Sequence, residues 1–471
     1  MEDPTAPLLP SATPVAEYSK EDRDAVYKKI GLRLLPLAFL ISLVCFVDRT
    51  NISLGAIPMS ADLKLSKSEF GTASSLFFVT YMLFQIPSNA ALQKIGGPVW
   101  LGTLLIGWGI AASLTAFAQN ATQLYVLRLI LGMFEAGTFP GLTYYLAFFF
   151  PEDRLAWAIG VANAGITVGM GLSAQLGAAI LEMDGVLNLQ GWQWLFVLEG
   201  IPALLIGAGS MMFLPKSPSS VGFLTIRERQ ILKKDNCTTQ QKSGMHRNFP
   251  YLVRTVILNW RLWLIVLTGF LFGTMMYTTM FWTPIWIDAM VNGGGLNWTK
   301  ASSSDPKGVQ AAILSAIPYG FSSVAVVLFG WTSGKLKDRK IHCMGLWVVG
   351  GGVFMLLPWL ADINIVLGFV ALIIGHIGVN GTAGPWLSLA MSFMTDENKG
   401  FGLAWLNSIG NLSGLLGPML TGIVADQTGS YKAAIWLVGG MLVFDGLVVA
   451  FMKDSVRDQP KRSKQVEISD A

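Results

Sequence analysis

Charged residues are scarce in this sequence. Of its 471 residues, only 13% are Asp, Glu, Lys or Arg, whereas 52% are hydrophobic, and the mean hydropathy is +0.53. A soluble domain usually carries about 25% charged residues. The composition therefore excludes an ordinary soluble protein. It indicates a polytopic membrane protein surrounded by the lipid bilayer.

Cysteine and histidine are also rare, with three residues of each. Cys45 and Cys343 fall in or beside apolar segments and Cys237 in a polar loop, so they form neither a disulfide framework nor a metal-ligand spacing. No phosphate loop, zinc spacing or nucleophile triad is present in the sequence, and we expect no enzyme, no cofactor and no metal. The basic stretch "RERQILKKD" is explained by a solvated helix near anionic lipid, so we expect no nucleic-acid partner.

Long apolar segments make up most of the sequence. A helix needs roughly 20 apolar residues to cross the bilayer. The predicted spans are 34–57, 69–92, 99–118, 122–149, 157–181, 193–214, 259–289, 309–332, 343–361, 364–393, 401–424 and 432–452. We therefore predict an all-α membrane protein with twelve transmembrane helices in two six-helix halves. The predicted divisions are a tail (1–33), a six-helix bundle (34–214), a linker (215–258), a second bundle (259–452) and a tail (453–471).

The positive charges give this topology an orientation. Most of the 33 Lys and Arg residues fall in the two tails, the linker and the loops on the same side. The loops on the opposite side hold only Lys64, Lys67, Lys300, Lys307 and Lys432. Because cytoplasmic loops carry the excess of Lys and Arg, both termini are predicted to be cytoplasmic.

The two halves also repeat each other. A shift of 244 residues places "EAGTFPG" (135–141) on "VNGTAGP" (379–385) and Asn163 on Asn407. It also places "PEDR" (151–154) on "TDEN" (395–398). Two related six-helix halves are typical of a transporter whose central site lies between them.

Four ionisable residues of the first half fall inside predicted spans. Asp48 and Arg49 are neighbours in one span, and Arg128 and Glu135 share another. Each would cost roughly 2.5–3.5 kcal/mol in the middle of the bilayer, so they must face one another, water or a ligand. Arg128 and Glu135 are two helical turns apart and therefore share one face. We predict a polar cavity lined by these two spans.

These residue types suit an anion and a proton. The guanidinium fork binds a carboxylate bidentately and stays charged, so Arg49 and Arg128 are predicted to bind substrate. Burial and neighbouring charges can change the protonation of a carboxylate, so Asp48 and Glu135 are predicted to couple protons. We expect Glu135 to be the principal coupling site, and Asp48 to pair with an arginine and control a gate.

The alternative is an ion-pair network that only holds the two helices together. A purely architectural network would be expected in both halves. In the second half, Leu372 and Val379 occupy the positions equivalent to Arg128 and Glu135, and we expect no such charges there. The asymmetry favours chemistry over architecture.

Four uncharged polar residues are further candidates for substrate binding. Tyr81 and Gln85 are one turn apart in the second span and share a face. Asn163 and Asn407 occupy equivalent positions of the repeat and could bind substrate hydroxyls. The alternatives are hydrogen bonding within the core for the first pair and helix association for the second.

Three stretches carry a resemblance to a known family: "VDRTNIS", "FFVTYMLFQIPSNAALQKIGG" and "LRLILGMFEAGTFPGLTYYLAFFFPEDR". They resemble the anion:cation symporter family of the major facilitator superfamily, strongly over the first six predicted helices and more weakly over the rest. That family includes carriers of sugar acids, tartrate, phthalate, nicotinate and allantoate, and it is related to vesicular glutamate and sialic acid transporters. The resemblance implies the major facilitator fold, with proton-carrying carboxylates at Asp48 and Glu135 and anion-binding arginines at Arg49 and Arg128.

Three functions remain open at this point. The first is proton-coupled symport of a small organic anion by alternating access. The second is anion exchange or potential-driven facilitated transport through the same arginines, and the third is a transporter-like sensor that binds the anion. We expect a monomer in the plasma membrane rather than in an internal membrane. The sequence names no particular anion.

Overall fold

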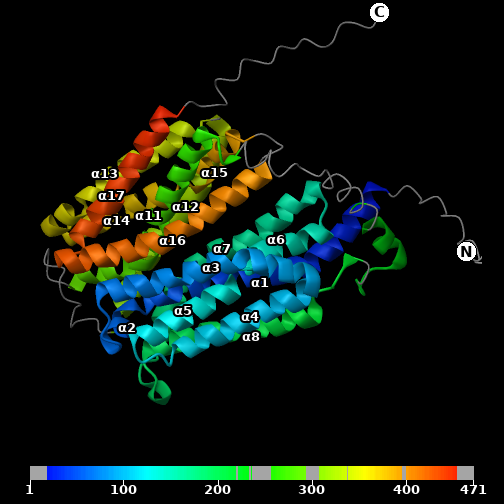
Figure 1. Ribbon diagram of the computed structural model, residues 1–471, viewed down its shortest axis with the longest axis horizontal. Helices are drawn as coiled ribbons and strands as arrows, with labels where there is room; N and C mark the ends of the chain where they lie inside the picture. Colours follow the sequence, from blue (N-terminus) through cyan, green and yellow to red (C-terminus); the bar gives the residue numbers. More distant parts are fainter. Residues whose placement is uncertain are drawn as a thin grey trace, which may run out of the picture.

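The computed structural model describes residues 19–218, 221–232, 235, 256–292, 307–336, 338–394 and 399–452 (Figure 1). Within these ranges the chain is built from helices and short connections. The helices of the first half are α1 (Lys20–Leu54), α2 (Ala56–Asp62), α3 (Lys67–Ile95), α4 (Gly97–Thr115), α5 (Ala121–Glu135), α6 (Thr138–Phe149), α7 (Glu152–Leu181), η1 (Val186–Asn188) and α8 (Gly191–Phe213). Those of the second half are α11 (Trp260–Asn292), α12 (Val309–Leu336), α13 (Lys340–Ile363), α14 (Ile365–Asn380), α15 (Ala383–Ser392), α16 (Lys399–Thr428) and α17 (Lys432–Phe451).

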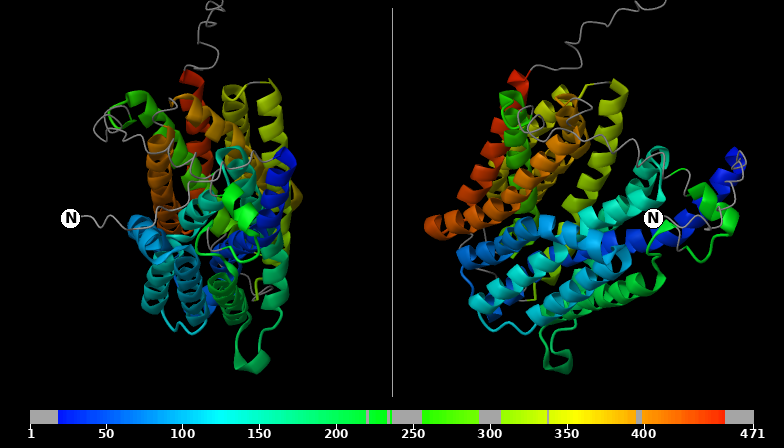
Figure 2. Two further views of the ribbon diagram at one scale, coloured as in Figure 1. Left: turned by 90° about the vertical axis from the view of Figure 1, so that its right-hand side faces the viewer. Right: turned by 45° about the vertical axis from the view of Figure 1, so that its right-hand side comes forward.

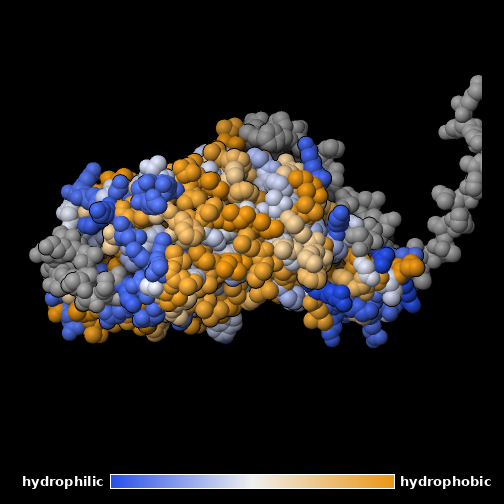
Figure 3. All heavy atoms as spheres, turned by 90° about the horizontal axis from the view of Figure 1, so that it is seen from below, coloured by the Kyte–Doolittle hydropathy of each residue, from blue (hydrophilic) through white to orange (hydrophobic). Residues whose placement is uncertain are grey.

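Ten helical segments of the described residues are long and apolar enough to cross a membrane, with α14 and α15 counted as one. The other two predicted spans are also helical. Span 122–149 is divided into α5 and α6, and span 157–181 lies within the single helix α7. Figure 3 shows hydrophobic side chains in a broad band across one face, with hydrophilic side chains gathered at both ends. The all-helical membrane fold is therefore as predicted, whereas length and composition support ten of the twelve spans.

Local sequence sets several helix ends. Ser66 and Glu69 form a capping box at the start of α3: the Ser66 hydroxyl accepts the Glu69 N–H at 3.2 Å, and Glu69 accepts the Ser66 N–H at 2.8 Å. Asn120 caps α5 by accepting the Gln123 N–H at 3.0 Å. Gly96, with φ of +97°, separates α3 from α4 because this backbone conformation suits glycine. These short signals fix where the helices that carry the site begin.

The interrupted helices lie at equivalent positions of the repeat. The break between α5 and α6 follows Glu135, and the break between α14 and α15 follows Asn380. A proline lies just beyond each break, at Pro140 and Pro385. Proline has no N–H, so the carbonyl four residues before it loses its helical partner and the helix breaks or bends. The sequence repeat is therefore reproduced as two discontinuous helices, which in transporters commonly border the substrate site.

The two halves lie side by side and are packed through α3 against α16 and α7 against α12 (Figure 1). They diverge toward the side on which α1 begins and α17 ends, here called the terminal side (Figure 2). At the opposite, closed side, the backbones of α3 and α16 approach very closely. A Cβ added to Gly71 would lie 2.6 Å from the Pro418 carbonyl oxygen. Only glycine allows this approach.

A second contact at the closed side involves a proline in α11. Pro284 leaves the carbonyl of Met280 without its helical N–H partner. That oxygen instead accepts the Ser53 hydroxyl of α1 at 2.9 Å and the Tyr319 hydroxyl of α12 at 3.0 Å. The irregular turn of α11 is thus satisfied partly by the other half of the molecule.

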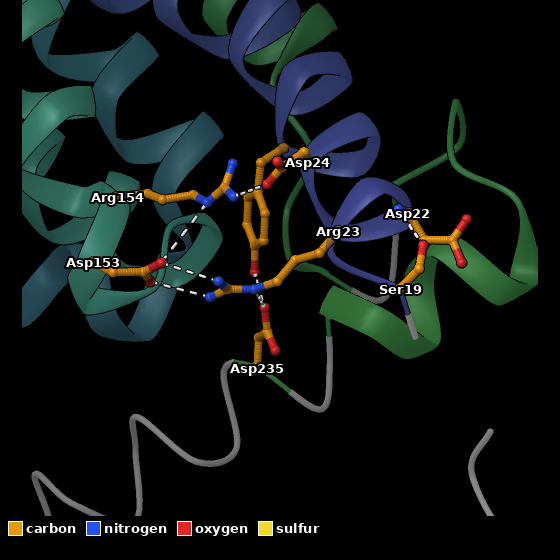
Figure 4. A network of polar contacts seen from close by, with 8 residues as sticks. Ser19, Asp22, Arg23, Asp24, Asp153, Arg154 and Asp235 are labelled. Carbon is orange, nitrogen blue, oxygen red and sulfur yellow. Dashed lines mark hydrogen bonds and ion pairs between the residues drawn. The ribbon is translucent and has the colours of Figure 1, made fainter. Parts of the chain in front are cut away.

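A polar network joins three segments on the terminal side (Figure 4). Arg23 of α1 donates to both carboxylate oxygens of Asp153, at 3.0 and 3.1 Å, and to Asp235 at 2.6 Å. The Tyr27 hydroxyl also donates to Asp235, at 3.0 Å. Hydrogen bonds from Arg23 hold the pKa of Asp153 below its usual range, so this contact persists at neutral pH and is lost only as the pH falls through that lowered pKa.

The described part of the predicted linker packs on the first half. Lys29 of α1 pairs with Glu228, and the Arg33 guanidinium lies 4.7 Å from the centre of the Phe223 ring. Leu232 is fully buried. Residues 1–18 and 453–471 of the predicted tails, and 236–255 of the predicted linker, lie outside the described residues. The division into tails, bundles and linker therefore stays a prediction.

Candidate functional site

An ion pair between α1 and α5 forms one part of the site. The Arg49 guanidinium contacts Oε1 of Glu135 through Nε and Nη2. The Cys45 thiol donates to the same oxygen at 2.9 Å. Glu135 is fully buried and Arg49 is 9% exposed, so the pair is almost completely removed from water. If Glu135 were protonated, Arg49 would be left as an unpaired buried charge, which is strongly unfavourable.

Asp48 points to a different helix. Its Oδ2 accepts the Trp108 indole N–H of α4 at 2.8 Å, and its Oδ1 accepts the Asn51 amide at 3.3 Å. Adjacent residues of a helix diverge by about 100°, so Asp48 and Arg49 reach different neighbours. The expectation that Asp48 pairs with an arginine is therefore wrong in this structure, where neutral donors hold its carboxylate and Arg49 pairs with Glu135.

The buried guanidinium of Arg128 has hydrogen-bond donors that are not used within the described residues. Its side chain is 3% exposed, and within the described part of the chain neither Nε nor Nη2 has a hydrogen-bond partner. Its guanidinium lies 5.6 Å from the centre of the Phe196 ring of α8. A buried guanidinium with unused donors is costly, because each lost hydrogen bond to water is unreplaced. An anion brought to Arg128 would replace those bonds.

Aromatic rings surround Arg49. Its guanidinium carbon lies 5.0 Å from the ring centre of Tyr81, 5.3 Å from that of Phe46 and 5.5 Å from those of Phe77 and Phe139. Rings at these distances attract the cation and exclude water. The structure thus brings the predicted residue Tyr81 to the predicted arginine, whereas its role in substrate binding stays a prediction.

The four charges enclose a small space between the two halves. Asp48, Arg49, Arg128 and Glu135 line it from the first half, and Tyr277 is among the residues that line it from α11. A larger cavity of about 490 Å³ lies in the second half. The structure therefore brings together the four charged residues that sequence reasoning selected.

The uncharged candidates are more dispersed. Asn407 is exposed and lines the larger cavity. Asn163 is exposed on α7, and Gln85 is half-buried on α3, and neither is among the residues that line the two cavities. The symmetric contribution expected from Asn163 and Asn407 is not visible in this arrangement.

Sequence reasoning missed three buried carboxyl groups: Glu199 in α8, Asp288 in α11 and Asp445 in α17. Within the described residues, both carboxylate oxygens of Glu199 and of Asp445 lack hydrogen-bond partners. The expectation that the second half carries no such charges is therefore wrong. The signal that could have identified each of these carboxyl groups is a single acidic residue inside an apolar segment of the sequence. Across the described ranges, no group of three His, Cys, Asp or Glu side chains could hold a metal ion.

Comparison with known proteins gives a consistent result. The family model described as Major Facilitator Superfamily matches residues 38–417 and 296–470. An Agrobacterium vitis protein, provisionally named as a tartrate transporter, is 32% identical over 436 residues, covering 93% of this chain and 92% of that protein. The quinolone resistance transporter of Acinetobacter baumannii is 29% identical, covering 91% and 94%.

Solved structures give the fold. A bacterial homologue of the human lysosomal transporter Spinster, inward-facing and occupied, has a TM-score of 0.71 at 18% identity. The match covers 93% of this chain and 98% of that one. The relatives by sequence are named for unlike substrates, so their names do not fix a substrate for this chain.

Proposed function

The chain belongs to the major facilitator superfamily, and from this premise we propose that it is a secondary active transporter that carries a small organic anion together with protons by alternating access. In this proposal twelve helices form two halves, with both termini in the cytoplasm, as the distribution of Lys and Arg supports. The transporter is a monomer in the plasma membrane, and its terminal side is the cytoplasmic side.

The observation that carries the proposal is the unsatisfied guanidinium of Arg128. It is buried, it has donors without partners in the described residues, and it lines the same small space as Arg49. Guanidinium groups bind carboxylates through paired hydrogen bonds. Two such groups in one enclosed space favour an organic anion over a neutral or cationic substrate.

Charge balance supports proton coupling. Asp48, Arg49, Arg128 and Glu135 sum to zero when both carboxyl groups are ionised. A bound anion would leave the buried site with one negative charge, and an uncompensated buried charge is strongly unfavourable. A proton taken up with the anion restores neutrality. Binding of the anion should therefore raise the affinity for the proton, and binding of the proton should raise the affinity for the anion.

The contact between Arg49 and Glu135 suggests how binding proceeds. A proton on Glu135 removes its charge and weakens its hold on Arg49. The released guanidinium then joins Arg128 in binding the carboxylate. When the proton leaves, Glu135 competes again for Arg49 and the anion is displaced. Glu135 is therefore the principal coupling group in this proposal.

The test is uptake of labelled organic acids into proteoliposomes that contain the purified protein. We expect saturable uptake that is faster when the outside is acidic. Arg128→Gln should abolish binding and uptake, because its unused donors are lost, and Arg49→Gln should weaken both. Transport of neutral sugars or cations without any carboxylate binding would contradict the proposal. Equal net uptake with and without a pH gradient would favour exchange or potential-driven transport instead.

A further inference from the structure

The cavity in the second half has an apolar wall built from aromatic rings. The rings of Phe272 and Trp386 lie 5.5 Å apart at 35°, and Phe272 lies 6.1 Å from Trp347 at 36°. The Trp386 indole N–H donates to the Thr268 hydroxyl at 3.1 Å, so its hydrogen-bond donor is already used. Phe272 and Trp386 line the cavity together with Met276 and Leu406. The wall offers flat apolar contacts to a ligand.

One polar group in this wall lacks a partner. Asn411 of α16 lines the cavity and is 7% exposed, and its amide nitrogen has no hydrogen-bond partner in the described residues. A buried donor left unsatisfied costs about 1–3 kcal/mol. A ligand acceptor at this point would satisfy it. Asn407 and Tyr277 are the other polar side chains that line the cavity, and Asn411 is the buried one whose amide nitrogen is unsatisfied.

The larger cavity and the charged site are neighbours that share one lining residue. Tyr277 lines both the larger cavity and the small space around Arg49 and Arg128. A ligand that is held by the arginines at one end and reaches past Tyr277 would meet the aromatic wall. With about 490 Å³, the larger cavity falls in the range that takes small organic molecules.

The lining also excludes one kind of anion. No Lys or Arg is among the residues that line the larger cavity. The second carboxylate of a small dicarboxylate would meet an apolar surface there without a cation, which is unfavourable.

From these observations we infer the substrate class: a monocarboxylate with a flat ring and a neutral hydrogen-bond acceptor on the side opposite the carboxylate. The carboxylate binds Arg49 and Arg128, the ring lies against Phe272 and Trp386, and the acceptor takes the Asn411 amide hydrogen. The inference rests on the proposed function as an organic-anion transporter and narrows it to ring monocarboxylates.

Three probes separate the contributions of the ring and of the acceptor to binding: pyridine-4-carboxylate, benzoate and tartrate. Pyridine-4-carboxylate has the ring and the acceptor, benzoate has the ring alone, and tartrate has neither. Calorimetry on the purified full-length protein should give the affinity order pyridine-4-carboxylate, benzoate, tartrate, with roughly three- to tenfold between the first two for one hydrogen bond. Uptake into proteoliposomes should follow the same order.

Asn411→Leu provides the matched variant, because it removes the donor and keeps a side chain of similar size. It should reduce the affinity for pyridine-4-carboxylate to that of benzoate and leave benzoate unchanged. Equal binding of pyridine-4-carboxylate by both proteins would overturn the role of Asn411. If Asn411→Leu does not fold, the two ring compounds on the unaltered protein still test the acceptor.

The outcomes distinguish this inference from the proposed function. Tight binding and uptake of tartrate, with no competition by either ring compound, would overturn the ring-monocarboxylate class while the organic-anion function stands. Binding and transport of none of the three acids, nor of any other carboxylate, would remove the proposed function and the inference together.

Discussion

Glu135 and Asp48 are both buried carboxyl groups, but their partners differ in charge. Glu135 contacts a guanidinium, whereas Asp48 accepts hydrogen bonds from an indole and an amide. Removing the negative charge of Glu135 therefore frees Arg49, whereas removing that of Asp48 weakens its hydrogen bonds with the Trp108 indole and the Asn51 amide. At the scale of single residues, the two groups should contribute differently to binding and to coupling.

We expect Glu135→Gln to uncouple transport from the pH gradient. The amide imitates a permanently protonated carboxyl, so it cannot load and unload a proton, and Arg49 remains available to the anion. Uptake driven by a pH gradient should fall close to background, while anion binding and exchange of internal for external substrate persist. Counterflow and pH-driven uptake in proteoliposomes measure the two activities separately.

Asp48→Asn is the matched comparison, because it makes the same chemical change, carboxylate to amide, at the other buried acid of the site, on α1. It should lower pH-driven uptake less than Glu135→Gln does, with anion binding retained. Normal pH-driven accumulation by Glu135→Gln would rule out Glu135 as the principal coupling site. Normal accumulation by both variants would rule out the coupling mechanism altogether.

The charged residues of the site were predictable from sequence, and their partners were not. Arg128 and Glu135 are conspicuous because ionised residues are rare in apolar segments. Trp108 and Cys45 carry no such signal, since a neutral residue in an apolar run looks the same whether it faces the site or lipid. Asn411 is likewise distinguished only by its place in the cavity wall.

The helix that carries Arg128 and Glu135 depends on a close approach to α3. Gly132 lies on their face of α5, and a Cβ added there would be 2.1 Å from the Phe77 carbonyl oxygen and 2.5 Å from the Thr80 hydroxyl. The carbonyl belongs to the backbone and cannot turn away. Any side chain at this position must push α5 from α3 and displace both charged groups.

Gly132→Ala should therefore destabilise the protein by about 1–3 kcal/mol, as overpacking does, and weaken anion binding. Thermal unfolding and calorimetry measure the two effects. Gly320→Ala in α12 is the control, because no atom lies within 4 Å of the added Cβ. The control should keep the melting temperature and the affinity. Unchanged stability and binding in Gly132→Ala would show that the contact with α3 does not position the site.

Apolar runs predicted where the helices are, but not how they are interrupted or how far they extend. Span 34–57 was predicted from hydropathy, whereas α1 begins at Lys20 because its first turns lie in a polar segment with its own cap at Ser19. Span 122–149 was predicted as one helix, and it is divided after Glu135. Hydropathy cannot show such a break, because the residues on both sides of it are equally apolar.

At the scale of the whole molecule, an acid of one half caps a helix of the other. Asp426 of α16 accepts the backbone N–H groups of Lys67 and Ser68, at 3.2 and 2.6 Å, at the start of α3. A negative charge at a helix N-terminus is favourable by typically 0.3–1 kcal/mol. The Lys67 ammonium also lies 4.6 Å from the centre of the Tyr431 ring. These contacts hold the closed side together.

Asp426→Ala should increase the fraction of molecules in which the closed side is open. Spin labels at Lys64→Cys and Gln427→Cys, one on each half, would report a larger population of long distances. Asp362→Ala is the control, because Asp362 pairs with Lys432 within the second half alone. An identical distance distribution for Asp426→Ala and the unaltered protein would show that this cap does not hold the halves together.

The sequence predicted two related halves but not their relative position. The repeat establishes that the halves share a plan. Whether they approach at one side or the other depends on a few contacts such as those of Asp426 and Ser53, which must break and reform during alternating access. One sequence encodes both arrangements, so no pattern in it selects the one seen here.

The length of α1 has a mechanical consequence. Its 35 residues span about 52 Å at 1.5 Å per residue, against a hydrocarbon core of about 30 Å. The excess, which carries Arg23 and Tyr27, projects beyond the bundle and is braced by Asp153 and Asp235 (Figure 4). Such a braced extension acts as a lever arm. A small tilt of the first half within the bilayer is amplified into a larger displacement of the arm's tip in water, where a single attached fluorophore could follow each transport cycle.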